Sequence, residues 1–180
     1  MDETLNPKQL SIEGQSAYKR GDYQAAARAF EAASQAYATL DDALNAAELA
    51  NNASVAYLQS GEAQAALQIL DGTAEVFRLA DDVRRQAMAI GNQAAALEAL
   101  GRLDEAIDAY QQSADLLKQA GEDQLRLNVM QILSALQLRT GRQLEALASM
   151  KVGLDGVEKL SVKQRLIKKL LNVPFQMMDK

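Results

Sequence analysis

The chain contains no cysteine, no histidine and no tryptophan, and only two of its 180 residues are proline. Without cysteine, neither a disulfide scaffold nor a thiol nucleophile is possible. Without histidine, the chain lacks the commonest general base and the commonest zinc ligand. No stretch approaches the ~20 consecutive apolar residues of a membrane-spanning helix, and the N-terminus lacks the apolar run of a secretory signal. We therefore expect a soluble, cytoplasmic protein without stable membrane insertion.

The residues that are present indicate an all-α protein with an acidic body. Apolar residues make up 48% of the chain but aromatic residues only 4%, and much of the apolar content is alanine. An alanine-rich, proline-poor chain with apolar residues at helical spacing predicts helices throughout. The net charge is −5, and because the part from Lys151 onward carries +4, the part before it carries −9. Nucleic-acid binding relies on neutralising phosphates with basic side chains, so nucleic acid is not the expected partner.

Four glycines recur at a step of forty residues, each followed at fixed offsets by an alanine and then a large residue. These sets are Gly21, Ala26 and Phe30; Gly61, Ala66 and Leu70; Gly101, Ala106 and Tyr110; and Gly141, Ala146 and Met150. A strict period of this length predicts a repeat array, in which each unit is a helix hairpin that buries its apolar face against its neighbours. Such arrays present extended surfaces that bind other molecules.

The period divides one domain, residues 1–180, into four hairpins and a C-terminal segment. The expected repeats are about 7–40, 41–80, 81–120 and 121–160, with a capping helix and tail at 161–180. Asn6-Pro7 predicts the start of the first helix, and each repeated glycine predicts the end of a helix. Acidic residues at Asp41-Asp42, Asp81-Asp82 and Glu122-Asp123 predict helix N-termini. The Ser161–Gln164 pattern predicts a capping box that opens a fifth segment ending at about Asn172.

Three columns of the repeat hold only small residues, which predicts where helices approach closely. The columns are Gly14, Ser54, Ala94 and Ser134; Ala26, Ala66, Ala106 and Ala146; and Ala33, Thr73, Ser113 and Gly153. Other columns hold large residues, which are expected to fill the space between repeats.

These columns resemble the tetratricopeptide repeat, whose hairpin has a small residue, a glycine, an alanine, an aromatic residue and a second small residue in fixed order. The run from Gly14 through Gly21, Ala26 and Phe30 to Ala33 matches that order in full. The resemblance covers about Lys8 to Val157 and implies a right-handed α–α superhelix, with four hairpins and a C-terminal capping helix. HEAT repeats share the period but lack the glycine–alanine turn signature.

Two departures from the usual repeat point to a subclass. The unit has forty residues rather than about 34, and the helix-ending proline is missing. The longer unit is similar to the long repeats of kinesin light chain and the spindle adaptor Pins. Asn51-Asn52-Ala53 and Gly91-Asn92-Gln93 resemble the asparagine-containing motif in the first helix of that subclass.

The resemblance also implies a binding face, because the first helix of each pair lines the concave side of such arrays. By family position, the candidate partner-binding residues are Lys8, Gln15, Lys19, Glu48, Asn51, Asn52, Val55, Arg84, Met88, Asn92, Asn128, Gln131 and Arg139, with Ser11, Gln59, Ala95, Glu98 and Ala135 beside them. Carboxamide groups are frequent in this set, and each offers a donor and an acceptor to the backbone of an extended peptide.

Asn52 and Asn92 stand out because they lie one repeat apart and are unfavourable inside a helix on propensity alone. Either both amides hold a peptide main chain, or they form hydrogen bonds between neighbouring helices and hold the superhelix. The carboxylate clamp found in some tetratricopeptide proteins is not expected, since of its positions only Asn52 fits here.

The C-terminal segment is a basic amphipathic stretch, with an apolar stripe at Leu166, Ile167, Leu170 and Leu171. We expect it to cap the last repeat, although the apolar tail Val173–Met178 could fold back, dock on a neighbour or form a dimer contact. An amphipathic helix of this kind could also touch an anionic membrane.

No catalytic, metal-binding or cofactor-binding motif is present, so no enzyme activity, cofactor or metal is expected. The sequence therefore predicts a non-catalytic adaptor that holds another protein or peptide in its concave groove. Two alternatives remain: a scaffold that forms homo-oligomers through its C-terminal segment, and a regulatory module that senses a small peptide or is attached to a catalytic partner.

Overall fold

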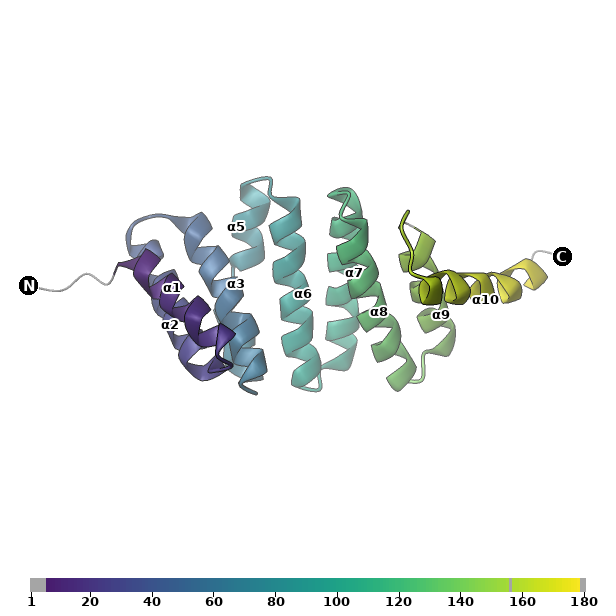
Figure 1. The fold of residues 1–180 in the computed structure, drawn as a ribbon, viewed down its shortest axis with the longest axis horizontal. Helices are drawn as coiled ribbons and strands as arrows, with labels where there is room; N and C mark the ends of the chain where they lie inside the picture. The colour runs from purple at the N-terminus through teal and green to yellow at the C-terminus, as the bar shows by residue number, and fades with distance from the viewer. Residues whose placement is uncertain (1–5, 156, 179–180) are drawn as a thin grey trace, which may run out of the picture.

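The computed structural model describes residues 6–155 and 157–178, with side chains through Leu171, as a row of helices (Figure 1). The helices are α1 (Pro7–Lys19), α2 (Tyr23–Thr39), α3 (Ala43–Gln59), α4 (Ala63–Ile69), α5 (Thr73–Leu79), α6 (Val83–Ala99), α7 (Leu103–Gln119), α8 (Asp123–Arg139), α9 (Gln143–Asp155) and α10 (Val162–Met178). The described residues contain no strand, as the sequence predicts. Each helix packs on the next along the chain or on its near neighbours, which produces an α–α solenoid.

The ends of the helices follow the predicted signals. Gly21, Gly61, Gly101 and Gly141 have φ between +75° and +85° and come directly after the first helix of each hairpin. The left-handed conformation is accessible to glycine without a steric penalty, so each glycine turns the chain into the second helix. The carboxylate of Asp42 accepts from the backbone N–H of Asn45 at 3.2 Å, and that of Asp82 accepts from Arg85 at 2.8 Å.

The acidic residue at the fourth hairpin behaves differently from these caps. Glu122 is the N-cap of α8, but its side chain makes no capping hydrogen bond there. Its carboxylate instead forms an ion pair with Arg84 of α6, with 2.7 Å between Nε and Oε1. Glutamate is a poor N-cap because its longer side chain does not reach the N–H groups of the first turn as well as aspartate does. The predicted helix N-terminus is confirmed here, since α8 begins at Asp123, although the Glu122 side chain does not cap it.

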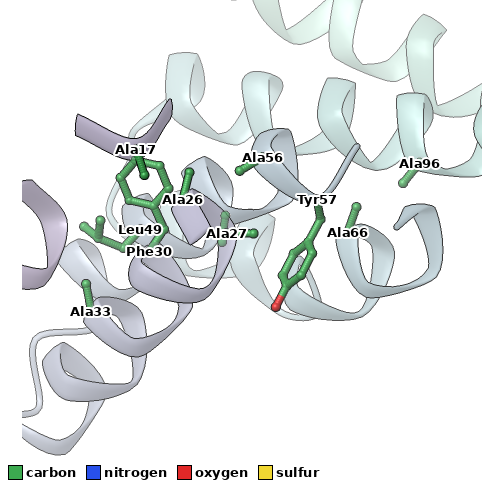
Figure 2. Packing of buried hydrophobic residues seen from close by; sticks show 11 residues of the cluster. Ala17, Ala26, Ala27, Phe30, Ala33, Leu49, Ala56, Tyr57, Ala66 and Ala96 are labelled. Atoms are coloured by element: carbon green, nitrogen blue, oxygen red, sulfur yellow. The ribbon is translucent and has the colours of Figure 1, made fainter. Parts of the chain in front are cut away.

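The predicted columns of small residues form the contacts between helices. Ala26, Ala66 and Ala106 are 0% exposed and Ala146 is 1% exposed. Figure 2 shows how the alanines surround the large side chain of Phe30 in the first hairpin. A Cβ added at Gly14 would lie 2.7 Å from the ring of Phe30, so the helices of this hairpin approach as closely as their smallest residue allows.

The second hairpin departs from the sequence prediction, because its second helix is broken. α4 ends at Ile69 and α5 begins at Thr73, and between them Gly72 has φ +72°. A residue with positive φ cannot continue a right-handed helix. The break nevertheless leaves the buried columns in place, since Thr73 and Phe77 are 4% and 1% exposed.

The C-terminal helix α10 begins with the predicted capping box. The Ser161 N–H donates to Gln164 Oε1 at 2.8 Å, and the Gln164 N–H donates to Ser161 Oγ at 3.3 Å. The backbone stays helical through Met178, beyond the predicted end at Asn172. α10 packs on α9 and leads away from the array along its long axis (Figure 1). The side chains of the predicted docking tail, Val173–Met178, lie outside the described residues.

In the part of the chain that the structure describes, the helices are too short or too polar to cross a lipid bilayer.

Candidate partner-binding site

The predicted binding residues lie on the first helices of the hairpins, α1, α3, α6 and α8. All of them are exposed or half-buried, so none is taken up by the core. Some of them connect neighbouring repeats, some surround a pocket, and the rest lie apart from both.

Polar side chains connect α3 with α6. The Asn92 amide donates from Nδ2 to Oδ1 of Asn51 at 2.8 Å. Beside this contact, the Arg85 guanidinium donates to Oε2 of Glu48 at 3.2 Å. This contact agrees with the supporting interpretation of Asn92, and its partner is Asn51 rather than Asn52. Glu48, Asn51 and Asn92 act together to hold the second and third repeats in register.

A second set of polar contacts connects α6 with α8. The Arg139 guanidinium donates to Oε1 of Glu98 at 2.9 Å, and Tyr110 of α7 donates its hydroxyl to Oε2 of the same carboxylate at 3.1 Å. Burial raises the pKa of Tyr110, and the nearby carboxylate of Glu98 raises it further. The Arg139–Glu98 contact and the Arg84–Glu122 ion pair connect the third and fourth repeats, whereas the Tyr110–Glu98 contact lies within the third. Arg84 and Arg139 are thus engaged within the protein.

The contact between the first and second repeats is different on this face. Among the described residues, no side-chain hydrogen bond or ion pair connects α1 with α3. A pocket of about 440 Å³ lies between them instead. It is lined by four of the predicted residues and by two aromatic residues: Gln15, Lys19, Asn52, Val55, Tyr18 and Phe30.

The pocket combines an apolar interior with free polar groups. Phe30, which is 4% exposed, and the half-buried Val55 provide apolar surface. The Tyr18 ring meets the Tyr23 ring edge-on, with 5.2 Å between ring centroids, and this contact fixes the aromatic wall. Within the described part of the chain, the side chains of Gln15, Lys19 and Asn52 have no hydrogen-bond or ion-pair partner. Apolar walls with a few convergent polar groups are typical of ligand sites.

Sequence reasoning missed the two aromatic residues of the pocket. Tyr18 lies on α1 three residues after Gln15, so it shares a helix face with that residue, which could have indicated it. Phe30 was assigned to the core, and it does lie in the core, but one part of its ring also borders the pocket.

The remaining predicted residues lie apart from this pocket. Lys8 is exposed in the first turn of α1, and Met88 is 36% exposed on α6. Asn128 accepts from Gln124 of its own helix at 3.4 Å, and Gln131 is half-buried on the same helix. The structure therefore does not bring the predicted set together as one continuous site.

A larger cleft, of about 840 Å³, lies at the break between α4 and α5, away from the predicted face. Its floor is one face of α6, with Ile90 and Leu97, and its sides belong to α4, α5 and α7. Five glutamines and two internal ion pairs, Glu75–Arg78 and Arg102–Glu105, line it. The Asp71-Gly72 pair is the signal in the sequence that could have indicated it.

Repeated helix hairpins, small-residue columns and a pocket on the first-helix face define a tetratricopeptide-like helical-repeat protein, a class whose members are typically interaction scaffolds. The chain belongs to the soluble NSF attachment protein (SNAP) family, whose model matches residues 9–171. It is also similar in fold to the crystal structure of MamA protein, with 19% sequence identity and a TM-score of 0.51 over 90% of this chain and 100% of that one. A search of curated protein sequences finds no match. The similarity to kinesin light chain and Pins stays a prediction.

Proposed function

We propose that this protein is a non-catalytic cytoplasmic adaptor that holds an extended segment of a partner protein on its first-helix face. The observation that carries this proposal is the pocket between α1 and α3. It lies on the predicted face, at the contact between repeats where polar side chains stay unpaired.

The chemistry of the pocket suggests which segment it would accept. A volume of about 440 Å³ suits one large side chain, and Phe30, Tyr18 and Val55 favour an apolar or aromatic one. The amides of Gln15 and Asn52 can each donate to and accept from a peptide backbone. Lys19 at the same pocket favours an acidic residue nearby. The proposed ligand is therefore an extended peptide in which an apolar or aromatic residue is close to an acidic one.

Rigidity supports the same function. Helices that are already held in place by packing and by polar contacts do not have to be ordered when a ligand binds, which lowers the cost of binding. In this proposal Asn51 and Asn92 hold the receiving surface, whereas Asn52 contacts the ligand. The family to which the chain belongs is named for attachment to NSF, which agrees with a role in holding a partner.

The alternative from the sequence, a scaffold that assembles through its C-terminal segment, predicts a different result in solution. Light scattering of the full chain would give a molar mass well above that of the 19.5 kDa monomer. An adaptor that binds its partner through the pocket can be a monomer.

The experiment that tests the pocket begins with selection of random linear peptides on the immobilised protein. Affinities of the selected peptides are then measured for the parent and for a Gln15→Ala, Asn52→Ala double variant. Because a lost hydrogen bond costs ~1 kcal/mol and 1.4 kcal/mol is a tenfold change in affinity, we expect the double variant to bind about tenfold more weakly or worse.

The matched control is an Asn128→Ala, Gln131→Ala double variant, which removes one amide of each kind from the same face but far from the pocket. It should bind as the parent does. The proposal is wrong if no peptide is enriched, or if the two double variants lose affinity equally. Thermal melts of both variants show whether a loss of affinity comes from unfolding.

A further inference from the structure

The helix α10 exposes an apolar stripe that nothing in the array covers. Val162, Leu166 and Leu170 are 85%, 59% and 62% exposed. They are four residues apart, so they form one continuous line along the helix. The adjacent side of the helix, with the half-buried Ile167 and Leu171, is the one that is shielded, so the apolar stripe predicted at Leu166, Ile167, Leu170 and Leu171 is only partly covered. α10 therefore covers the last repeat with only part of its apolar surface, and the rest faces outward.

Basic side chains border this stripe on both sides. At 3.6 residues per turn, Lys163 lies beside Leu166 and Leu170 on one side, while Arg165 and Lys169 lie on the other. All three basic residues are exposed, and none has an ion-pair partner among the described residues. Narrow apolar stripes with lysine and arginine at their edges are typical of helices that lie in the surface of a lipid bilayer.

The placement of α10 separates this basic surface from the acidic body. The part of the chain before Lys151 carries −9, whereas the part from Lys151 onward carries +4. α10 points away from the array (Figure 1). Its Lys168 turns back to the array instead, with Nζ 3.0 Å from Asp155 Oδ1 and 3.2 Å from the Leu154 carbonyl oxygen. Lys168 thus fixes the helix on α9, and Arg165 donates from Nε to the Leu160 carbonyl oxygen at 3.1 Å. Lys163 and Lys169 have no hydrogen-bond or ion-pair partner among the described residues.

From this arrangement we propose that α10 binds reversibly to the surface of an anionic lipid bilayer. The three apolar side chains enter the boundary between headgroups and acyl chains, and Lys163, Arg165 and Lys169 contact the anionic headgroups. Two copies of α10 stacked on each other through the same stripe would bring these basic side chains together, which disfavours a symmetric dimer through this face. The inference is independent of the pocket between α1 and α3, which lies at the other end of the array.

The experiment is flotation of the full chain with vesicles. Vesicles of equal parts phosphatidylcholine and phosphatidylserine are compared with vesicles of phosphatidylcholine alone. We expect the protein to float with the anionic vesicles only, and raising the salt concentration should release it, because salt screens the attraction between basic side chains and headgroups. Only weak binding is expected, since one short helix supplies the contact.

Two variants separate the apolar and basic contributions, each with a matched control. A Leu166→Ser, Leu170→Ser variant and a Lys163→Gln, Arg165→Gln, Lys169→Gln variant should each lose most of the flotation. The controls remove equally exposed residues elsewhere. They are Leu40→Ser with Leu79→Ser, residues that are 65% and 71% exposed, and Arg20→Gln with Arg28→Gln and Lys118→Gln, all exposed. Both controls should float as the parent does.

Three results would overturn the proposal. The parent could fail to float with anionic vesicles, it could float equally with both compositions, or the controls could lose as much as the α10 variants. Light scattering of the same proteins tests whether a second copy of this chain, rather than a membrane, covers the apolar stripe of α10. The membrane proposal is wrong if the parent is an oligomer, does not float with vesicles, and becomes a monomer in the Leu166→Ser, Leu170→Ser variant. In that case a second copy of this chain covers the stripe.

Discussion

The second helices of the second and third hairpins have the same length in residues but different structures. Residues 63–79 form α4 and α5 with a break between them, whereas residues 103–119 form the single helix α7. The difference lies at their centres, where Asp71-Gly72 occupies the positions of Gln111-Gln112 one repeat later. Glycine costs a helix ~1 kcal/mol relative to alanine and adopts positive φ easily, so this pair favours a break.

The buried columns are the same in both hairpins, and this shows which part of the pattern determines the fold. Ala66 and Ala106 are both 0% exposed, and Phe77 and Leu117 are 1% and 2% exposed. Packing between repeats thus survives the interruption of one helix. What changes is the outer surface, where the break borders the cleft of about 840 Å³.

The largest expected effect compares how tightly the second helices of the second and third hairpins are packed. Ala106→Leu places a large side chain where α7 packs on α6 and α8, and we expect it to lower the free energy of unfolding by ~3 kcal/mol. Ala66→Leu should cost only ~1–2 kcal/mol, because the seven-residue α4 can shift toward the adjacent cleft. Urea denaturation of the parent and both variants measures the difference. Equal losses would show that the break gives α4 no extra freedom.

A smaller effect is expected at the break itself. An alanine at residue 72 would meet no atom within 4 Å, so the cost of Gly72→Ala is only that of holding a non-glycine residue at φ +72°. We expect a loss of ~1–2 kcal/mol in the same denaturation experiment. Gly72→Asn serves as the control and should cost less, because asparagine tolerates the left-handed conformation better. A stability gain with alanine would instead mean that α4 and α5 join into one helix like α7.

The smallest effect appears at high pH and concerns the tyrosine–glutamate contact between the first and second repeats, compared with the one inside the third repeat. Tyr57 donates its hydroxyl to Glu31, and burial, followed by that hydrogen bond, raises the pKa of Tyr57 to about 12. Because the folded state holds this proton more tightly than the unfolded state, the contribution to stability is fully present below pH ~10 and is lost as the pH rises toward 12.

A Tyr57→Phe variant should lack this loss. Between pH 9 and 11 its free energy of unfolding should fall by ~1 kcal/mol less than that of the parent. Urea denaturation at a series of pH values measures how the free energy of unfolding of each protein depends on pH. An equal dependence in the parent and the variant would contradict a raised pKa for Tyr57. Tyr110→Phe, in the third repeat, is the comparison variant, since its hydroxyl donates to Glu98 in the same way.

Most of the fold could be predicted from the sequence because it depends on local signals that repeat. The turn glycines and the aspartate caps each act within a few residues and recur at the forty-residue step, and the first helix begins at Pro7 with Asn6 as its N-cap, as predicted. The break at Gly72 was not predicted, since the buried columns continue through it and indicated an unbroken helix. Whether residues 63–79 form one helix or two depends on a balance between the local preference of Asp71-Gly72 and packing, and the period of the sequence does not reveal that balance.

The site was predicted less completely, for a reason that Asn52 and Asn92 illustrate. The two residues occupy the same column, and nothing in the sequence distinguishes them. In the structure, Asn92 meets Asn51, a residue 41 positions away rather than forty, and Asn52 lies at the pocket instead. Which of the two asparagines of α3 faces α6 is decided by how whole helices pack. The side chains that meet across repeats therefore follow only from the three-dimensional arrangement.

The polar contacts between the first helices also distinguish one junction of the solenoid from the other two. Cross-links join α3 to α6 and α6 to α8 on the first-helix face. Between α1 and α3 the described side chains provide no such link, and the first two repeats are held instead by α2–α3 packing and the Tyr57–Glu31 hydrogen bond. A peptide bound in the pocket between α1 and α3 would therefore supply, from the partner, the connection that this face of the chain lacks.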